Sequence, residues 1–268
     1  MKTVRPGRAI PSVGAKLIAV LGFAILYIPL VSLVVYSFLD VPQVPGGPRE
    51  WTLHWYQRLL QNHVILEAFQ QSLMVGLWTT FFSTVIGTSA ALALTRSRFP
   101  GRRIFDGFTY VPLIMPEIVL GLSLLIWFVF LKIALGTFSI VLAHVTFSMS
   151  YVMITVKARL EGFDDSLEEA AQDLGATPWK TFWKVTFPLI SPGVLSGALM
   201  AFTLSFDDFL ITFFTAGAGS DTLPLKIYSM IKFGVTPEIN ALSTLMLVVT
   251  FLLVFIFFNP RKTPTSRA

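Results

Sequence analysis

The chain reads LIAVLGFAILYIPLVSLVVYSFL from Leu17 to Leu39, a run of 23 residues without a formal charge. About 20 apolar residues in a helix cross the hydrocarbon core of a bilayer, so this run can span a membrane. It is longer than the apolar core of a signal peptide, and we predict an uncleaved span. Similar runs recur along the chain, and together they predict an all-α membrane protein.

Five further apolar segments are long enough to cross a bilayer. Glu117 interrupts one of these runs, and another runs into Asp207 and Asp208. With the first run they predict six transmembrane helices in one domain over residues 1–268. The approximate spans are 17–39, 68–95, 107–131, 133–156, 188–216 and 239–258.

The composition excludes several classes of function. Hydrophobic residues make up 54% of the chain and charged residues only 13%, whereas about 25% is usual in soluble proteins. The net charge of +5 comes from short basic clusters between apolar runs, which is not the pattern of a nucleic-acid-binding domain. The chain has no cysteine, and His54, His63 and His144 are scattered. We therefore expect no metal site and no thiol chemistry.

The distribution of basic residues predicts the orientation in the membrane. Short cytoplasmic loops carry an excess of Lys and Arg. If the N-terminus is cytoplasmic, fifteen of the twenty Lys and Arg residues fall on the inner side. Both termini and the segment 157–188 are then predicted to be cytoplasmic.

The segment 157–188 is polar enough to leave the bilayer, and it reads as two short helices. Asp165 and Ser166 each precede a glutamate by three residues, which is the pattern of a capping box, so a helix should start near Ser166. Gly175 can take the left-handed conformation that ends it, and Thr177 with Pro178 would start the second helix. We expect Pro188 to stop that helix just before the fifth span.

The same segment carries a motif. Glu169-Ala170-Ala171 is followed by three residues, by Gly175, by nine residues and then by Val185-Thr186-Phe187-Pro188. In this spacing the sequence resembles the permeases of ABC importers, with Val185 and Phe187 in place of the commoner Ile and Leu. An ordinary helix–turn–helix loop is the alternative, and the position between the fourth and fifth of six spans argues against it.

The resemblance implies a type I ABC importer permease, which is a transport subunit and not an enzyme. It also implies that this segment couples the permease to an ATPase, through Glu169, Ala170, Ala171, Gly175 and Pro188. The chain has no phosphate-binding loop of its own. We therefore expect no cofactor on this chain, with ATP and Mg²⁺ bound to a separate ATPase dimer.

Strings along most of the chain are similar to those of the spermidine/putrescine permeases. They are Trp55-Tyr56, His144 to Phe147, Glu169 to Ala176, Phe202 to Asp208, Leu223 to Met230, and Pro237 to Leu242. This branch implies a polyamine substrate, a second related permease in a heterodimer, an extracytoplasmic binding protein, and the bacterial inner membrane with its lipids. In this branch the position of Glu117 is usually Asp.

Three acids lie within the predicted spans: Glu117, Asp207 and Asp208. A charge near the bilayer centre costs about 2.5–3.5 kcal/mol on insertion scales, so such residues usually face a cavity and a partner. No Lys or Arg lies deep within a run, so a neighbouring subunit or a cationic substrate would supply the charge. The alternative is that the acids are hydrated at the span edge or protonated.

Other residues support the predicted pathway. Pro112 and Pro116 predict a kink beside Glu117. Ser205 lies near Asp207 on the helix and either assists there or packs between helices. Trp55 in the outer loop either stacks on an ammonium group or anchors the chain at the interface. We expect His144 to make an interhelical hydrogen bond and leave it outside the site.

Alternative functions remain open. A related ABC permease would carry another cation, an amino-acid derivative or iron. A proton-coupled secondary transporter would also bury acids, although it would not explain the coupling motif. A membrane-embedded enzyme would need a nucleophile, a metal cluster or an acid–base pair, for which the cysteine and histidine inventory offers little.

Overall fold

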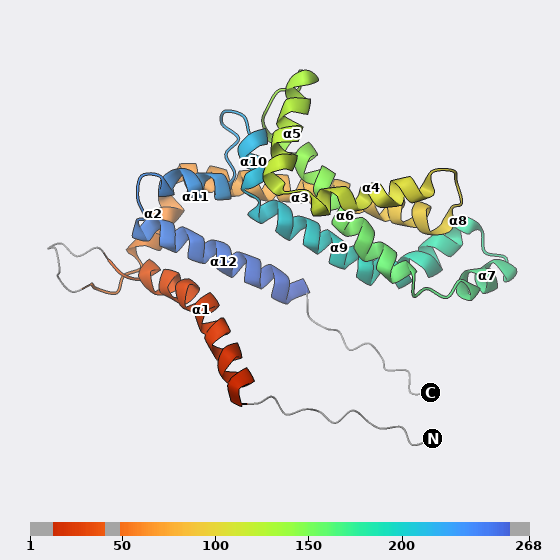
Figure 1. Ribbon diagram of the computed structural model, residues 1–268, viewed down its shortest axis with the longest axis horizontal. Helices are drawn as coiled ribbons and strands as arrows, with labels where there is room; N and C mark the ends of the chain where they lie inside the picture. The colour runs from red at the N-terminus through yellow and green to blue at the C-terminus, as the bar shows by residue number, and fades with distance from the viewer. Residues whose placement is uncertain (1–12, 41–48, 258–268) are drawn as a thin grey trace. The chain divides into compact units, whose positions relative to one another are not determined.

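A computed structural model describes residues 13–40 and 49–257 of the chain (Figure 1). The described residues are helical apart from loops and one isolated antiparallel bridge between Leu39 and Trp51. The elements are α1 (Val13–Ser37), α2 (His54–Gln61), α3 (His63–Arg96), α4 (Arg102–Ile114), α5 (Glu117–Phe130), α6 (Thr137–Leu160), α7 (Ser166–Asp173), α8 (Pro178–Thr181), the π-helical turn η1 (Phe182–Thr186), α9 (Phe187–Asp207), α10 (Leu210–Thr215), α11 (Leu223–Ile231) and α12 (Pro237–Phe257).

Two compact units make up the chain, and each is described by itself. The first comprises Met1–Gln61 and Met230–Val249, and it holds α1, α2 and most of α12. The second comprises Asn62–Ser229 and Thr250–Ala268, and it holds α3 to α10 and most of α11. Of the terminal basic residues used for orientation, Lys16 lies in α1; the others, and the end of the last predicted span, residue 258, lie outside the described residues.

In the first unit the residues just after α1 pair with those just before α2. The amide of Asp40 donates to the carbonyl of Glu50, and the amide of Thr52 donates to the carbonyl of Phe38. The hydroxyls of Ser37 and Tyr56 lie 2.6 Å apart. These bonds hold α2 against the end of α1.

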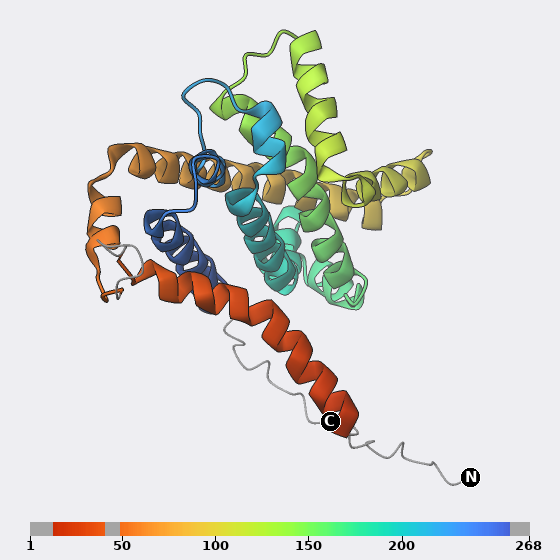
Figure 2. The same ribbon diagram turned by 60° about the vertical axis from the view of Figure 1, so that its left-hand side comes forward.

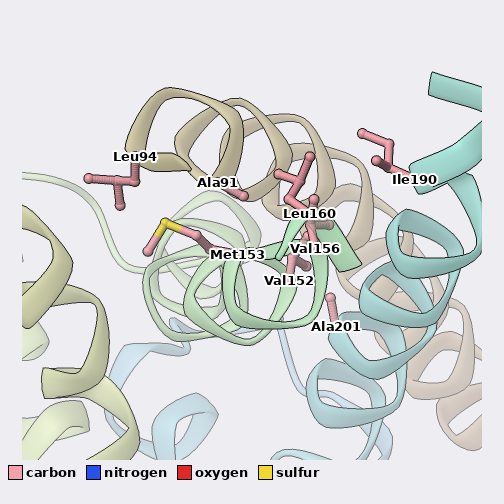
Figure 3. Packing of buried hydrophobic residues seen from close by; sticks show 8 residues of the cluster. All are labelled: Ala91, Leu94, Val152, Met153, Val156, Leu160, Ile190 and Ala201. Atoms are coloured by element: carbon pink, nitrogen blue, oxygen red, sulfur yellow. The ribbon is translucent and has the colours of Figure 1, made fainter. Parts of the chain in front are cut away.

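The core of the second unit lies between α3, α6 and α9 (Figure 3). Buried alkyl side chains from the three helices meet there, and they are Ala91, Leu94, Val152, Met153, Val156, Leu160, Ile190 and Ala201. Glycines permit the close approach: a Cβ atom at Gly87 would lie 2.7 Å from the carbonyl oxygen of Met149 and 2.8 Å from Cβ of Val152. Small residues at helix contacts are typical of membrane bundles, where packing drives association.

The predicted span 107–131 is divided into two helices. The axes of α4 and α5 differ by 111° at a break over Met115 and Pro116 (Figure 2). Both residues are extended, with ψ angles of 136° and 133°. Proline lacks an amide hydrogen and disfavours helical geometry at the residue before it, so Pro116 accounts for the break. Pro112 stays inside α4.

Four described helices are long and apolar enough to cross a membrane, and the bent pair α4 and α5 would make a fifth. Within the described residues, α12 adds a shorter apolar stretch, Pro237–Leu252. The all-helical, multi-pass class is therefore established. The predicted count of six spans and the single domain over 1–268 stay predictions.

The segment between α6 and α9 forms the two predicted helices, with two corrections. Helix α7 begins at Ser166 as expected, but the carboxylate of Asp164 caps it by accepting the Ser166 amide at 3.1 Å. Hydrogen bonds from Ser166 also hold the pKa of the Asp164 carboxyl below its usual range. The capping role predicted for Asp165 and Ser166 is therefore wrong.

The second correction concerns Pro188. The predicted stop before the fifth span is wrong, because α8, η1 and α9 follow one another as a single helical stretch, Pro178–Asp207. The amide of Phe187 bonds to the carbonyl of Phe182, five residues back. This wider π-helical turn just before Pro188 accommodates a residue that lacks an amide hydrogen, so the helix continues.

Candidate functional site

A cavity in the second unit gathers the three acids that the sequence analysis singled out. Its volume is about 350 Å³, within the ~300–1,000 Å³ range of small-molecule sites. It lies beside both helix breaks, the one between α4 and α5 and the one between α9 and α10. The lining residues are Pro112, Glu117, Leu120, Phe147, Tyr151, Thr203, Leu204, Asp207, Asp208, Phe209, Leu210 and Ile211.

Glu117 is the first residue of α5 and is exposed. Among the hydrogen bonds and ion pairs of the described residues, none involves the Glu117 carboxylate. The group is therefore available to a ligand in the cavity.

Asp207 is the last residue of α9 and is also exposed. Its carboxylate makes no hydrogen bond or ion pair with other residues in the described part of the chain. The carboxyl-terminal end of a helix carries a partial negative charge, so it adds to the attraction of this carboxylate for a cation.

Asp208 has different surroundings. It is extended, with φ −68° and ψ 130°, and it separates α9 from α10. Its side chain is only 6% exposed. The carboxylate accepts the amide of Thr212 at 2.8 Å and the hydroxyl of Thr212 at 2.9 Å, and it lies 3.1 Å from Nε2 of His144. Asp208 thus caps α10 and contacts α6.

His144 makes the interhelical hydrogen bonds that we predicted. The ring is fully buried in α6, and its Nδ1 atom lies 2.8 Å from the hydroxyl of Ser205 in α9. Ser205 is 4% exposed, and its contact is with His144 rather than with Asp207. The pathway role of Ser205 stays a prediction. His144 was left outside the predicted site as a helix-packing residue, and its partners, 61 and 64 residues away in the chain, place it beside Asp208.

Trp55 belongs to the first unit. It lies in α2, is half-buried, and donates its indole N–H to the carbonyl of Leu39 at 3.2 Å. His54 contacts its ring edge. A role for Trp55 in admitting substrate stays a prediction.

The candidate coupling residues lie at the tip of the segment between α6 and α9. Glu169 and Ala170 are exposed in α7, and Gly175 takes the left-handed conformation with φ 86°. The large apolar side chains of Leu174 and Trp179 are 90% and 71% exposed. We name these four exposed residues, Glu169, Ala170, Leu174 and Trp179, the coupling face.

A neighbouring glutamate that the sequence analysis did not select fixes the coupling face to the bundle. Glu168 lies 2.6 Å from the guanidinium of Arg96, at the end of α3. The same carboxylate accepts a hydrogen bond from the buried hydroxyl of Thr186 in η1. The Arg96 guanidinium also lies over the ring of Phe163, 5.5 Å from its centroid, which is within reach of a cation–π interaction.

Metal ligation has little support in this part of the molecule. Among the described residues, no group of three or more His, Asp and Glu side chains could hold a metal ion. The cavity is therefore an acidic, partly aromatic site whose carboxylates can attract cations.

Comparison with known proteins defines the class. The profile of the family described as "Binding-protein-dependent transport system inner membrane component" matches residues 83–259, and the chain belongs to this family. The protein is thus a membrane component of a transport system, and the predicted resemblance to ABC importer permeases is confirmed.

Individual transport permeases are similar to this chain over most of its length. The chain is 41% identical over 232 residues to the spermidine/putrescine transport system permease protein PotC of Escherichia coli K12, covering 87% of this chain and 88% of that protein. It is 44% identical over 237 residues to the putrescine transport system permease protein PotI of the same strain, covering 86% and 84%. Identity to the sulfate transport system permease protein CysT is 30% over 250 residues, covering 88% of each.

Solved structures share the fold. A bacterial ABC transporter involved in alginate import matches with a TM-score of 0.71 at 15% identity, covering 91% of this chain and 92% of that one. The MetNI methionine ABC transporter matches with a TM-score of 0.59 at 16% identity, covering 77% and 96%. At these identities the likeness shows the fold alone.

Proposed function

We propose that this chain is the permease subunit of an ATP-driven importer of polyamines and forms half of the translocation pathway. The observation that carries the proposal is the cavity that holds the carboxylates of Glu117 and Asp207 without an internal cation. The relatives named for spermidine and putrescine transport support the same cargo.

The chemistry of the cavity suits an organic polycation. Two carboxylates with no ion-pair partner among the described residues are costly to hold within membrane spans, and a protonated amine relieves that cost as it passes. Tyr151 and Phe209 line the same cavity and offer ring faces, on which an ammonium group gains about 0.5–2 kcal/mol. No covalent step is needed, because substrate is bound, exposed to the other side and released.

The partners follow from the same proposal. An ATPase dimer binds the coupling face and carries ATP and Mg²⁺. A second, related permease completes the pathway as a heterodimer, and an extracytoplasmic binding protein delivers substrate. In this proposal the chain crosses the bacterial inner membrane six times, with both termini in the cytoplasm.

A sulfate permease is among the relatives, so an anionic cargo is the competing proposal. The charge of the cavity argues against it. A dianion would meet Glu117, Asp207 and Asp208, and like charges in a medium of low dielectric repel one another strongly. Glu117 and Asp207 would have to be protonated before sulfate could pass.

Uptake by neutral variants tests the proposal. Asp207→Asn and Glu117→Gln keep the shape of the cavity and remove one charge each, so uptake of radiolabelled putrescine should fall at least tenfold, the effect of losing about 1.4 kcal/mol. Asp221→Asn is the matched control, because Asp221 is exposed in the same unit and does not line the cavity.

Assembly with the ATPase and basal ATP hydrolysis should survive in all three variants. Putrescine uptake at the unmodified rate in both Asp207→Asn and Glu117→Gln would contradict the cation site. If sulfate inhibited uptake by the importer and putrescine did not, the competing anionic cargo would be favoured.

A further inference from the structure

A group of hydrogen-bonded polar side chains reaches the cavity wall at Asp208 and extends behind it to His144, Ser205 and Thr212. Its centre is the fully buried ring of His144. Nδ1 lies 2.8 Å from the Ser205 hydroxyl, and Nε2 lies 3.1 Å from Oδ2 of Asp208 and 3.0 Å from the hydroxyl of Thr212. The group joins α6, the end of α9 and the start of α10.

One arrangement of hydrogens satisfies every member of the group. The Ser205 hydroxyl donates to Nδ1, and the Nε2–H of a neutral imidazole donates to Asp208. The Thr212 hydroxyl and amide also donate to Oδ2 of Asp208, while the Ile211 amide approaches Oδ1 at 3.4 Å. Both oxygens of Asp208 thus have donors from within the chain.

These internal donors separate Asp208 from its neighbour Asp207. A substrate ammonium that approached Oδ2 of Asp208 would compete with donors that are already in place. Asp207 has no such donors within the described residues and is exposed toward the cavity. The two adjacent acids therefore differ in what they can offer to a cation.

The group also fixes the backbone at the break between α9 and α10. Asp208 is the extended residue at which the helix stops, and its carboxylate holds the first amides of α10. His144 holds that carboxylate from α6. The direction in which the Asp207 side chain points from the end of α9 therefore depends on this turn.

We propose that His144 is a positioning residue of the transport site. Through Asp208 it holds the break between α9 and α10 and so directs the carboxylate of Asp207 into the cavity, while Asp208 itself does not bind substrate. The inference rests on the proposed cation site and assigns the three side chains different roles within it.

Three substitutions of His144 test the contact with Asp208. Gln carries an amide nitrogen near the position of Nε2, Asn carries a group near the position of Nδ1, and Phe keeps only the ring. Putrescine uptake by the assembled importer should stay within about threefold of the unmodified rate in His144→Gln. It should fall roughly tenfold or more in His144→Asn and His144→Phe, because a buried hydrogen bond to a charged group is lost.

Two substitutions of Thr212 provide a second test, in which a smaller loss of uptake is expected. Thr212→Val removes the hydroxyl that donates to Asp208 and keeps the amide donor, whereas Thr212→Ser keeps both. Uptake should fall several-fold in the Val variant and stay near the unmodified rate in the Ser variant. Equal uptake in His144→Gln and His144→Asn, together with equal uptake in Thr212→Val and Thr212→Ser, would overturn the proposal.

Thiol labelling at residue 207 reports on the position of this side chain rather than on the stability of the protein. The chain has no cysteine, so Asp207→Cys introduces its single thiol. A cationic thiol reagent should label Cys at this position, and putrescine should slow the labelling. Adding His144→Phe should change the labelling rate at least threefold, whereas adding His144→Gln should not; an unchanged rate in both backgrounds would contradict the positioning role.

The outcomes distinguish this inference from the proposed function. If Asp207→Asn and Glu117→Gln both transport normally, the cation site itself fails. If Asp207→Asn abolishes uptake while all His144 and Thr212 variants transport normally, the site stands and the positioning role fails.

Discussion

Asp207 and Asp208 are adjacent in sequence, yet their carboxylates have opposite surroundings. Asp207 ends a helix and faces a cavity without a partner, whereas Asp208 is 6% exposed and accepts hydrogen bonds from α10 and α6. Neighbouring positions in a helix point about 100° apart, and the extended backbone at Asp208 separates them further. Single substitutions are therefore expected to differ in mechanism even where both reduce transport.

Gly175 is a residue at which the backbone alone predicts the effect of substitution. Its φ of 86° is left-handed, and an added Cβ would meet no atom within 4 Å. Gly175→Val therefore causes no clash but costs about 1–2 kcal/mol in backbone strain. We expect the coupling face to lose its geometry, so putrescine uptake and substrate-stimulated ATP hydrolysis should both fall in the assembled importer.

Gly162→Val is the control for this prediction. Gly162 lies in the same segment, also has open space around its Cβ position, and does not have a left-handed φ. Transport should stay near the unmodified rate in this variant. Equal transport by the two valine variants would mean that the left-handed turn at Gly175 does not matter for coupling.

The conformation and contacts of some residues could be predicted from sequence because they depend on nearby residues, whereas those of other residues could not. The left-handed Gly175 and the Thr177 cap, whose side chain accepts the amide of Lys180, depend on neighbours within a few residues. The contact between His144 and Asp208 spans 64 residues and exists only once α6 and α10 have packed. Residue types alone could not indicate which acid would be saturated by internal donors.

At the level of elements, two interrupted helices meet at one cavity. Broken helices at membrane depth are tolerated where the backbone lines a cavity or is buried in protein. The break at Pro116 was foreseeable as a kink, because proline marks it. The break at Asp208 has no proline or glycine, and the predicted span 188–216 was drawn straight through Asp207 and Asp208.

The link between the coupling segment and the bundle gives an element-level prediction. Glu168 pairs with Arg96, whose side chain is 33% exposed, and also accepts from the Thr186 hydroxyl, which is buried. Partly exposed ion pairs contribute about 0–1 kcal/mol, whereas a buried hydroxyl left unpaired costs about 1–3 kcal/mol. The contact with Thr186 should therefore matter more than the ion pair.

Two substitutions separate these contributions. Glu168→Gln keeps an acceptor for Thr186 and loses only the ion pair, so ATP-driven putrescine uptake should change little. Glu168→Ala loses both contacts, and uptake should fall roughly fivefold or more. Glu161→Ala is the control, since Glu161 is exposed just before the same segment. A larger loss in the Gln variant than in the Ala variant would contradict this ranking.

At the scale of the whole molecule, the described residues place the carboxylates of Glu117 and Asp207 at one cavity without a counter-charge. Within residues 13–40 and 49–257, the ion pairs involve Glu168, Asp208 and Asp106, and none balances Glu117 or Asp207. A membrane protein rarely tolerates such charges unless a partner or a passing ion compensates them. This requirement ties the chain to an assembly and a cationic cargo.

The orientation in the membrane decides whether the coupling face can meet an ATPase at all. The excess of Lys and Arg predicts that 157–188 lies in the cytoplasm and that the loop containing Asp221 lies on the opposite side. Because the chain has no cysteine, single thiols report on each side without background from this subunit. Gln172 and Asp221 are both exposed and suit this purpose.

In sealed cells that express the permease without its ATPase, an impermeant thiol reagent should label Asp221→Cys and leave Gln172→Cys unmodified. In inverted membrane vesicles the pattern should reverse, because the reagent then reaches the cytoplasmic face first. Putrescine transport by both variants in the assembled importer verifies that the native topology is being measured. If Gln172→Cys were labelled from outside intact cells, the coupling face would lie on the extracytoplasmic side, where an ATPase could not bind it. The proposal of an ATP-driven importer would then be wrong.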